Sequence, residues 1–377
     1  MLPSLNLKTL NPDFVKLLVV YFIWTAAWNL GASLFEVYFF NQGLSIANIF
    51  LANTIWFIAG IFAIPLFTKI NSKNFILAGI FITFVSFLML YFIHDSWVAF
   101  AFRFLGGLAG FFFWIPFNIT FYEFRNKNNA FLGAIYYSIT PMCSLILPAL
   151  AGWIAITYSF GLLFLLCAVC YALTFLLALV FLKRYNYHYN FISSLKSISG
   201  LRSLIFLEGF AATVIVSVIL DIILLIHVNT PFEFGIFVSL TTVFAVVASL
   251  ITARFSDKLK QRGKFMLPIV AGFALASIAT SQAPNVIVFF ICFGFAEFFS
   301  RVFFPLPLAL VVDNSTSIIE SMAAREFVLN VGRVTGAVVC YLILISSNIQ
   351  MALLFEGFVL LLYVPVFENR KKKLQYQ

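Results

Sequence analysis

The 377-residue sequence contains few charged side chains. Asp, Glu, Lys and Arg make up 10% of it, whereas hydrophobic residues make up 63% and the mean hydropathy is +1.05. A soluble domain needs more polar surface than this composition can supply, so the composition excludes one. Long polar segments are also missing between the apolar runs. We therefore expect an all-α polytopic membrane protein that acts within the bilayer.

Residue patterns that indicate an enzyme or a metal site are missing too. His94, His188 and His227 are too scattered to form a metal site, and neither HExxH nor a Ser/His pair occurs in an apolar run. Cys167 and Cys170 have CxxC spacing, but within a single apolar run this spacing is typical of ordinary packing. We expect no enzymatic activity, no metal and no cofactor.

The net charge of +9 does not indicate a nucleic-acid partner. The cations lie in short alternate loops, which is the distribution that the positive-inside rule describes, so the partner they predict is the lipid bilayer. The first apolar run is too long for a signal peptide and lacks a small-residue cleavage site. It is expected to be the first membrane span.

Long apolar runs predict the membrane-spanning helices, because about 17 residues or more are needed to cross a bilayer. We expect twelve, near 14–40, 46–68, 75–93, 97–121, 130–155, 160–182, 203–227, 232–253, 265–282, 286–311, 323–345 and 349–367. The predicted organisation is a six-helix bundle over 1–182, a cytoplasmic linker over 183–200 and a second six-helix bundle over 201–377.

Alternate loops differ in charge, and this difference predicts the orientation. No Lys or Arg occurs in 41–45, 94–96, 157–159, 228–231, 283–285 or 346–348. All but three of the 23 Lys and Arg residues lie on the other side, and the exceptions, within spans, are Arg103, Arg301 and Arg333. We expect an integral plasma-membrane protein with both termini in the cytoplasm.

The two halves of the sequence are related. A shift of 185 residues places Glu36 on Asp221, with apolar runs of matching length after each acid. The same shift places Lys69 on a cation of the basic loop at 249–267, which carries the candidate gate residues Arg254, Asp257, Lys258 and Arg262. Such a repeat is common in transporters.

Three short motifs accompany the repeat. The loop pattern GxLaDrxGrk lies on Ala253 to Arg262, although both of its glycines are replaced. The fourth-helix pattern lxxxRxxqGxg lies on Ala99 to Ala109, with Arg103 and Gly107 in register. The fifth-helix antiporter pattern gxxxGPxxGG matches loosely over 143–152, where Pro148 and Gly152 fit.

With these motifs, the twelve spans resemble the major facilitator superfamily, and in particular its drug/proton antiporters. The resemblance covers nearly the whole chain. It implies two pseudo-symmetric six-helix bundles that work by alternating access around a central cavity, with the basic loop as a cytoplasmic gate. The first-half copy of that loop has Ser72 where the acid belongs, so a gating role is expected mainly of the second-half loop.

Polar residues recur along one face of the first and seventh spans, and two aligned stripes predict a wet cavity. The stripes consist of Thr25, Asn29, Ser33 and Glu36 in one span, and Thr213, Ser217 and Asp221 in the other. Glu36 and Arg103 lie at matching depth, so we expect them to pair. The carboxylate either exchanges a proton against substrate or forms a static ion pair between two helices.

Further charged side chains lie within the later spans. Glu297 and Arg301 are four residues apart, which favours an intrahelical pair that either neutralises itself or meets substrate. Arg333 and Asn330 are expected at the cavity, with Arg333 facing the cavity or Glu297. Glu356 is expected to face lipid, because the twelfth helix is peripheral in the fold that the resemblance implies.

Aromatic residues could stack a flat substrate in the cavity or serve as packing and interface anchors. The candidates for the cavity are Trp24, Trp28, Trp114 and Tyr137. Such residues more often serve as packing or interface anchors, so we favour that interpretation for any single one of them.

Together these features predict a secondary active transporter, expected to be monomeric. We favour proton-coupled export of an amphiphilic or cationic small molecule, with Glu36, Asp221 and Glu297 as the coupling acids. The alternative is uptake or facilitated transport of a small metabolite or organic anion held by Arg103, Arg301 and Arg333. An intramembrane enzyme or a sensor would need a catalytic constellation or an output domain, neither of which the sequence shows.

Overall fold

A computed structural model describes residues 12–124, 130–228, 230–256, 262–315 and 317–371, without the side chains of 122–124, 130–138, 249–256, 262–265 and 370–371. The first half contains α1 (Pro12–Gly31), η2 (Ala32–Leu34), α2 (Phe35–Asn41), α3 (Ile46–Leu66), β1 (Lys69–Asn71), α4 (Ser72–Phe92), α5 (Val98–Phe124), α6 (Ala130–Thr157) and α7 (Phe160–Phe181). The connection contains β2 (Asn186–His188) and α8 (Phe191–Ser197). The second half contains α9 (Arg202–Leu207), η3 (Glu208–Thr213), η4 (Ile215–Ile219), α10 (Leu220–His227), α11 (Pro231–Ser256), α12 (Arg262–Ser281), α13 (Val286–Phe303), α14 (Pro305–Asp313), α15 (Ile318–Ser346), α16 (Ile349–Leu361) and α17 (Tyr363–Lys371).

These helices form an all-α membrane protein, as predicted. Within the described residues, 11 helical segments are long and apolar enough to cross a bilayer, and the shorter apolar segment Met266–Ser281 completes the twelve. Their apolar side chains face either each other or the surroundings, as expected where lipid replaces water.

Several spans that we predicted as continuous are interrupted. The first span changes to a 3-10 turn at Ala32–Leu34, and the seventh contains two π-helical stretches, Glu208–Thr213 and Ile215–Ile219. The tenth span restarts at Pro305, whose ring cannot continue the hydrogen bonding of the preceding turn. These interruptions rotate the side chains that follow them, because 3-10 and π turns hold different numbers of residues from an α turn.

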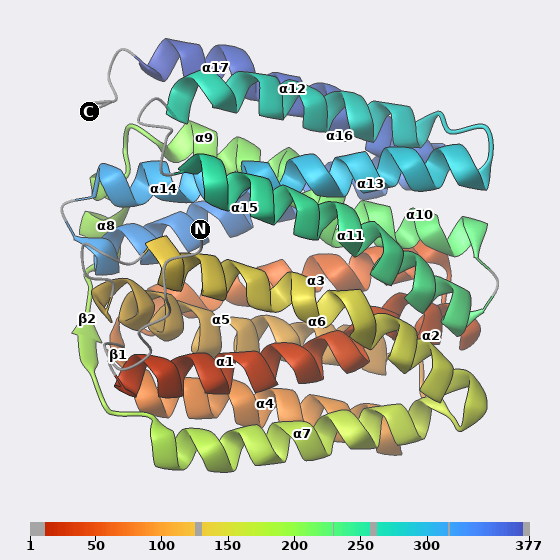
Figure 1. Cartoon of the computed structure of the whole chain (residues 1–377), viewed down its shortest axis with the longest axis horizontal. Coiled ribbons are helices and arrows are strands. Elements are labelled where there is room, and N and C mark those ends of the chain that lie inside the picture. The colour runs from red at the N-terminus through yellow and green to blue at the C-terminus, as the bar shows by residue number, and fades with distance from the viewer. Residues whose placement is uncertain (1–11, 125–129, 229, 257–261, 316, 372–377) are drawn as a thin grey trace.

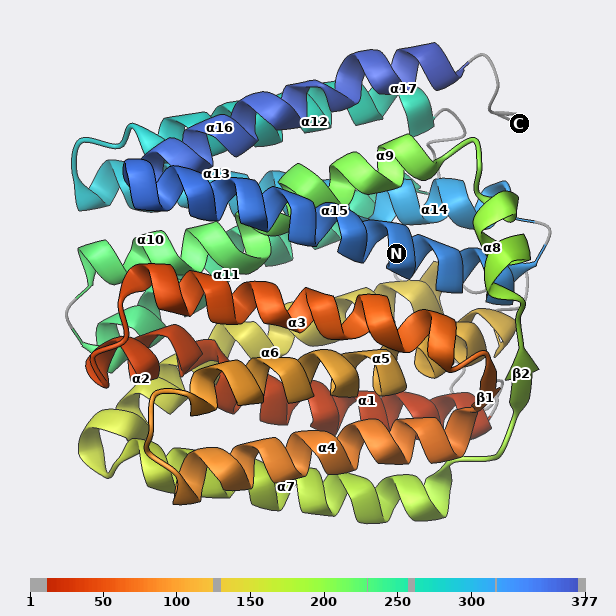
Figure 2. The same ribbon diagram turned by 180° about the vertical axis from the view of Figure 1, so that it is seen from behind.

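The two halves of the chain lie side by side. Helices α1 to α7 occupy the lower part of Figure 1, and the helices from α9 onward occupy the upper part. Across the division, α6 packs along α11 and α3 packs along α15, and Figure 2 shows the second of these contacts. We call the end of the molecule that carries β1, β2 and α8 the strand end.

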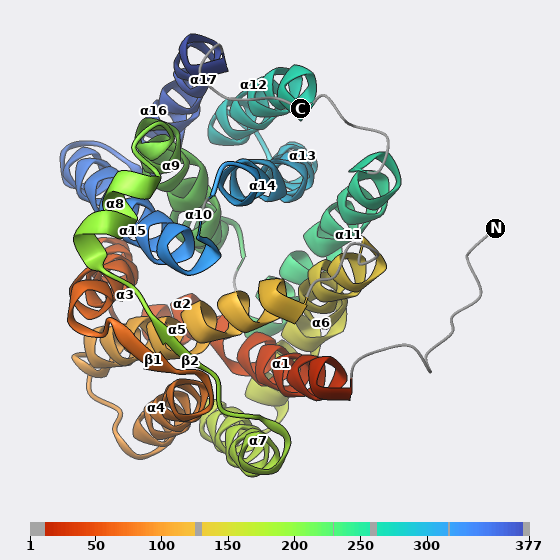
Figure 3. The ribbon, with the colours of Figure 1, turned by 90° about the vertical axis from the view of Figure 1, so that its left-hand side faces the viewer.

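A small sheet crosses the strand end, and we did not predict it from the sequence. β1 and β2 pair antiparallel, with Lys69 opposite His188 (Figure 3). Beyond β2, the hydroxyl of Tyr189 donates to the carbonyl oxygens of Ile64 at 2.5 Å and Phe67 at 3.2 Å, at the end of α3. Burial raises the pKa of the Tyr189 phenol, so it remains protonated and able to donate.

Candidate functional site

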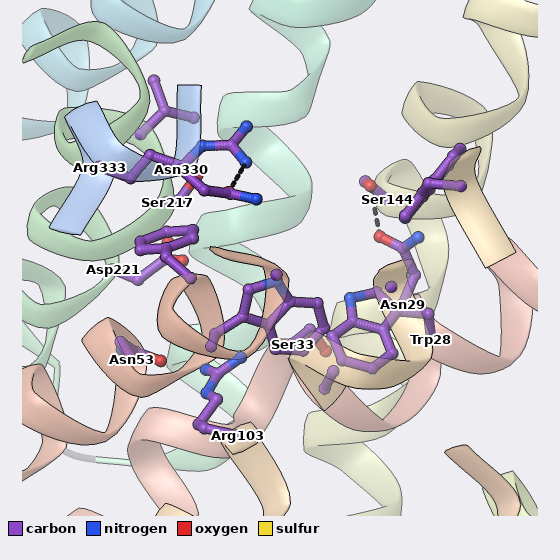
Figure 4. Close-up of a pocket in the computed structure, with 18 of the residues that line it drawn as sticks. Trp28, Asn29, Ser33, Asn53, Arg103, Ser144, Ser217, Asp221, Asn330 and Arg333 are labelled. Atoms are coloured by element: carbon purple, nitrogen blue, oxygen red, sulfur yellow. Dashed lines mark hydrogen bonds between the residues drawn. The ribbon is translucent and has the colours of Figure 1, made fainter. Parts of the chain in front are cut away.

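A cavity of about 520 Å³ lies between the two halves, within the size range of small-molecule sites. Side chains from α1, α2, α3, α5 and α6 line one wall, and η4, α10, α11, α13 and α15 line the other (Figure 4). Most of the predicted cavity residues line it, namely Trp28, Asn29, Ser33, Glu36, Arg103, Trp114, Asp221, Glu297, Arg301, Asn330 and Arg333.

The predicted ion pair between Glu36 and Arg103 is confirmed. Arg103 Nη2 lies 2.5 Å from Glu36 Oε1, and Asn53 Nδ2 donates to the same oxygen at 3.1 Å. The guanidinium also lies over the Phe35 ring, 3.7 Å from its centroid. α5 also lies close to α3, because a Cβ on Gly107 would collide with the Trp56 carbonyl oxygen. Glu36 is therefore fully partnered within the first half.

The other two arginines of the cavity also have carboxylate partners. Arg301 Nη2 lies 3.3 Å from Glu297 Oε2, which confirms the predicted intrahelical pair. Arg333 Nη1 donates to Asn330 Oδ1 at 2.7 Å and lies 3.9 Å from Glu326 Oε2. Arg333 thus faces the cavity but pairs with Glu326, not with Glu297.

Asp221 differs from the other cavity carboxylates. Among the described residues it has neither a hydrogen-bond donor nor an ion-pair partner within contact distance, although it interacts electrostatically at longer range with Glu36, Glu297, Arg103 and Arg301. The cavity lining carries the carboxylates of Glu36, Asp221, Glu297 and Glu326, against three guanidinium groups. The described lining thus contains one more carboxyl group than guanidinium groups, and Asp221 is the one without a partner.

Three predicted cavity residues are not in the lining. Trp24 is buried and stacks on Phe113 with ring centroids 4.4 Å apart, and Thr25 is also buried. Thr213 donates to the carbonyl oxygen of Glu208, because the π-helical turn places that oxygen within reach of its hydroxyl, at 3.0 Å. The polar stripes thus line the cavity over a shorter length than we predicted, because their members nearest the strand end do not reach it.

Some predictions concern side chains outside the described part of the chain. These are the aromatic candidate Tyr137 and the gate residues Arg254, Asp257, Lys258 and Arg262.

Two buried carboxylates lie outside the cavity. Glu208 Oε1 lies 2.5 Å from Nη2 of Arg325. Nη1 of the same guanidinium lies 2.9 Å from Glu326 Oε1. Our prediction that Glu356 faces lipid is wrong: it is fully buried and accepts a hydrogen bond from Cys340 Sγ at 2.9 Å. Its face of α16 packs against α15 instead of pointing outward.

We did not single out several lining residues from the sequence, including Asn53, Trp56, Ser144, Thr241 and Thr242. Ser144 donates to Asn29 Oδ1 at 2.5 Å and thereby joins α6 to α1. Asn53 is an amide in the interior of an apolar run, and this position could have indicated a polar partner for Glu36.

Comparisons with known proteins agree with this architecture. The sequence model of the Major Facilitator Superfamily matches residues 11–198 and 201–375. No curated protein sequence matches the chain.

Solved transporters have the same fold at low sequence identity. A POT family transporter in complex with 5-aminolevulinic acid superposes with a TM-score of 0.74 at 14% identity, over 96% of each chain. The human organic anion transporter MFSD10 (TETRAN) gives 0.73 at 10% identity, covering 95% of this chain and 100% of its own. A bacterial homologue of the iron transporter ferroportin in the outward-facing state with soaked iron gives 0.68 at 13%, covering 95% and 99%. Because the family match extends over nearly the whole chain, the protein belongs to the Major Facilitator Superfamily of membrane transporters.

Proposed function

We propose that this protein is a secondary active transporter, not an enzyme, and that it exports a small organic cation in exchange for protons. The observation that carries the proposal is the unpartnered carboxyl group of Asp221, in a cavity whose described lining has one more carboxyl group than guanidinium groups. An ionised carboxylate at this depth is costly unless something neutralises it. Either a proton or a substrate cation can do so, and the two exclude each other.

This competition supplies the coupling. Protonation of Asp221 on one side of the membrane releases the cation, and deprotonation on the other side allows the next cation to bind. The remaining charges do not need to move, because Glu36, Glu297 and Glu326 each keep an arginine partner. We propose that those pairs hold the cavity wall in place while Asp221 exchanges a proton for a substrate cation.

The same pairs argue against an organic anion as substrate. An anion held by Arg103, Arg301 or Arg333 would have to displace a carboxylate already within 4.0 Å of the guanidinium. It would also approach Asp221, whose carboxylate repels an anion whenever it is ionised. The alternative of an arginine clamp is therefore the weaker one.

The shape of the cavity favours loading from the strand end. Its lining on α5 continues from Arg103 to Asn118, about 22 Å along the helix at 1.5 Å per residue, toward the strand end. The positive-inside pattern predicts that this end and both termini lie in the cytoplasm, and we propose that the membrane is the plasma membrane. We propose that a monomer loads cations there and releases them outside.

We further propose that residues 1–182 and 201–377 move as two bundles joined by the 183–200 segment. Rocking of the two bundles would expose Asp221 to one side at a time.

The test is proton movement in liposomes that contain the purified protein and a pH-sensitive dye. Cationic, neutral and anionic compounds are added outside in turn. We expect cations alone to move protons, and Asp221→Asn to abolish this movement.

Glu356→Gln is the matched control, because it also removes a fully buried carboxyl group but lies outside the cavity. It should leave proton movement unchanged. Substrate flux without proton movement, or normal coupling in Asp221→Asn, would contradict the proposal.

A further inference from the structure

The internal repeat extends to the cavity wall. The shift of 185 residues that places Glu36 on Asp221 also relates the lining residues of α3 to those of α11. Under this shift the lining residues Asn53, Trp56 and Phe57 correspond to Val238, Thr241 and Thr242, which also line the cavity. The surroundings of the two acids can therefore be compared position by position.

Glu36 and Asp221 differ in the donors around them. Glu36 accepts from Asn53 and from Arg103, but the counterpart of Asn53 is Val238, which has no donor. Asp221 thus lacks the first of the two donors that its counterpart has.

The second donor is also missing. On α13 the lining residues are Phe293, Glu297 and Arg301, and a shift of 186 relates them to the α5 lining residues Gly107, Phe111 and Ile115. The same shift places the fully buried Phe289 opposite Arg103. The position of the second half that corresponds to Arg103 therefore carries no guanidinium.

The two threonine hydroxyl groups that α11 contributes to the lining act as acceptors toward the cavity. Thr241 Oγ1 donates to the carbonyl oxygens of Phe237 at 3.1 Å and Val238 at 3.0 Å, and Thr242 Oγ1 donates to that of Val238 at 2.8 Å. A hydroxyl has a single proton to donate, so toward the cavity these oxygens have only lone pairs. Together with Asp221 they form a surface that needs donors.

Building on the proposed function, we infer that the transported cation carries several N–H donors, as a guanidinium or primary ammonium group does. This group takes the place beside Asp221 that the Arg103 guanidinium takes beside Glu36. The Arg103–Glu36 pair of the first half thus resembles the contact that the substrate cation makes with Asp221. A quaternary ammonium ion, which has no N–H, leaves the carboxylate and the threonine oxygens without donors.

The test compares cations that differ in their N–H groups. The probes are benzylguanidine, benzylamine and benzyltrimethylammonium, with benzyl alcohol as the neutral reference. Binding to the purified full-length protein is followed by the fluorescence of Trp28 and Trp56, which line the cavity. We expect the two N–H cations to bind at least about tenfold more tightly than benzyltrimethylammonium, the effect of one or two charged hydrogen bonds. Asp221→Asn should remove this preference.

A substitution on α11 tests the internal comparison itself. Val238→Asn should give Asp221 the donor that Asn53 gives Glu36, and should weaken benzylguanidine binding by about tenfold. Val238→Leu, of similar volume, has no donor and should retain the preference for N–H cations. Thermal unfolding of each variant checks that it is folded.

Equal or tighter binding of benzyltrimethylammonium would overturn the inference, and so would absence of binding by both N–H cations. A different result is expected if the inference holds but the proposed exchange of cations for protons does not. In that case the N–H cations bind selectively, but their binding does not weaken as the pH falls, because no proton competes with them.

Discussion

The charged side chains of the described cavity lining are of two kinds, paired groups and one unpaired carboxylate. We expect the paired groups to affect stability and the unpaired carboxylate to affect transport. Glu36 is 3% exposed and bonded to Arg103, so removal of either partner leaves a buried charge alone. Asp221 has no such partner among the described residues, so its removal leaves no charge behind. Folding should depend on the first residue and transport on the second.

We therefore predict opposite effects of two neutralising substitutions. Glu36→Gln should lower the free energy of unfolding by about 3 kcal/mol, because Arg103 loses its countercharge, and the double variant Glu36→Gln/Arg103→Gln should recover much of the loss. Asp221→Asn should leave stability nearly unchanged. Unfolding midpoints of the purified proteins measure all three. Equal destabilisation by Glu36→Gln and Asp221→Asn would refute this division.

At the residue scale, depth and periodicity predicted the charged pairs best. Matching depths led to the Glu36–Arg103 pair, and a spacing of four led to Glu297–Arg301. Rotation about the helix axis was harder to predict. Glu356 was assigned to lipid because only its helix, and not the face it occupies, could be inferred from the sequence.

At the element scale, α6 and α11 make a reciprocal contact near the end opposite the strands. Each helix contributes a proline followed four residues later by a glycine, Pro148 with Gly152 and Pro231 with Gly235. A Cβ on either glycine would collide with the carbonyl oxygen of the proline on the other helix. Ser239 Oγ also accepts from the backbone N–H of Ala149, at 3.2 Å. The loosely matching fifth-helix motif thus lies at a contact between the halves.

We predict that Gly152→Ala weakens this contact and favours opening at that end. The added methyl group meets backbone, which cannot rotate away, so the closed contact should lose about 1–3 kcal/mol. Alkylation of a cysteine introduced at Ser33, by a membrane-impermeant reagent added outside, should then rise on the order of tenfold.

Gly200→Ala is the control, because no atom lies within 4 Å of its Cβ position. Unchanged alkylation in Gly152→Ala would show that the contact does not close the cavity.

Elements longer than about 17 apolar residues could be predicted from the sequence, but their interruptions could not. The residues of η2 and η4 are apolar or small and include no proline, so nothing in Ala32–Leu34 or Ile215–Ile219 marks a change of helix type. Such changes arise from packing between helices, which a single sequence does not display. Thr213, which donates a hydrogen bond within its π-helical stretch and does not line the cavity, shows the consequence.

At the scale of the whole molecule, the alternation of apolar runs and charged loops was sufficient to predict an all-α membrane fold with twelve apolar helices. The contacts between the halves were not predictable, since α6–α11 and α3–α15 join segments far apart in the sequence. The cavity and its unpaired carboxyl group depend on those contacts. The function that we propose therefore depends on the structure more than on any motif.

The central claim is that a proton and a substrate cation compete for Asp221, and proton release on binding tests it most directly. Benzylguanidine is added to the purified protein in lightly buffered solution with a pH indicator, at a pH where the empty site is protonated. We predict release of about one proton for each cation bound, and none with Asp221→Asn, since one carboxylate exchanges its occupant. Binding without proton release in the wild-type protein, across the accessible pH range, would contradict the account.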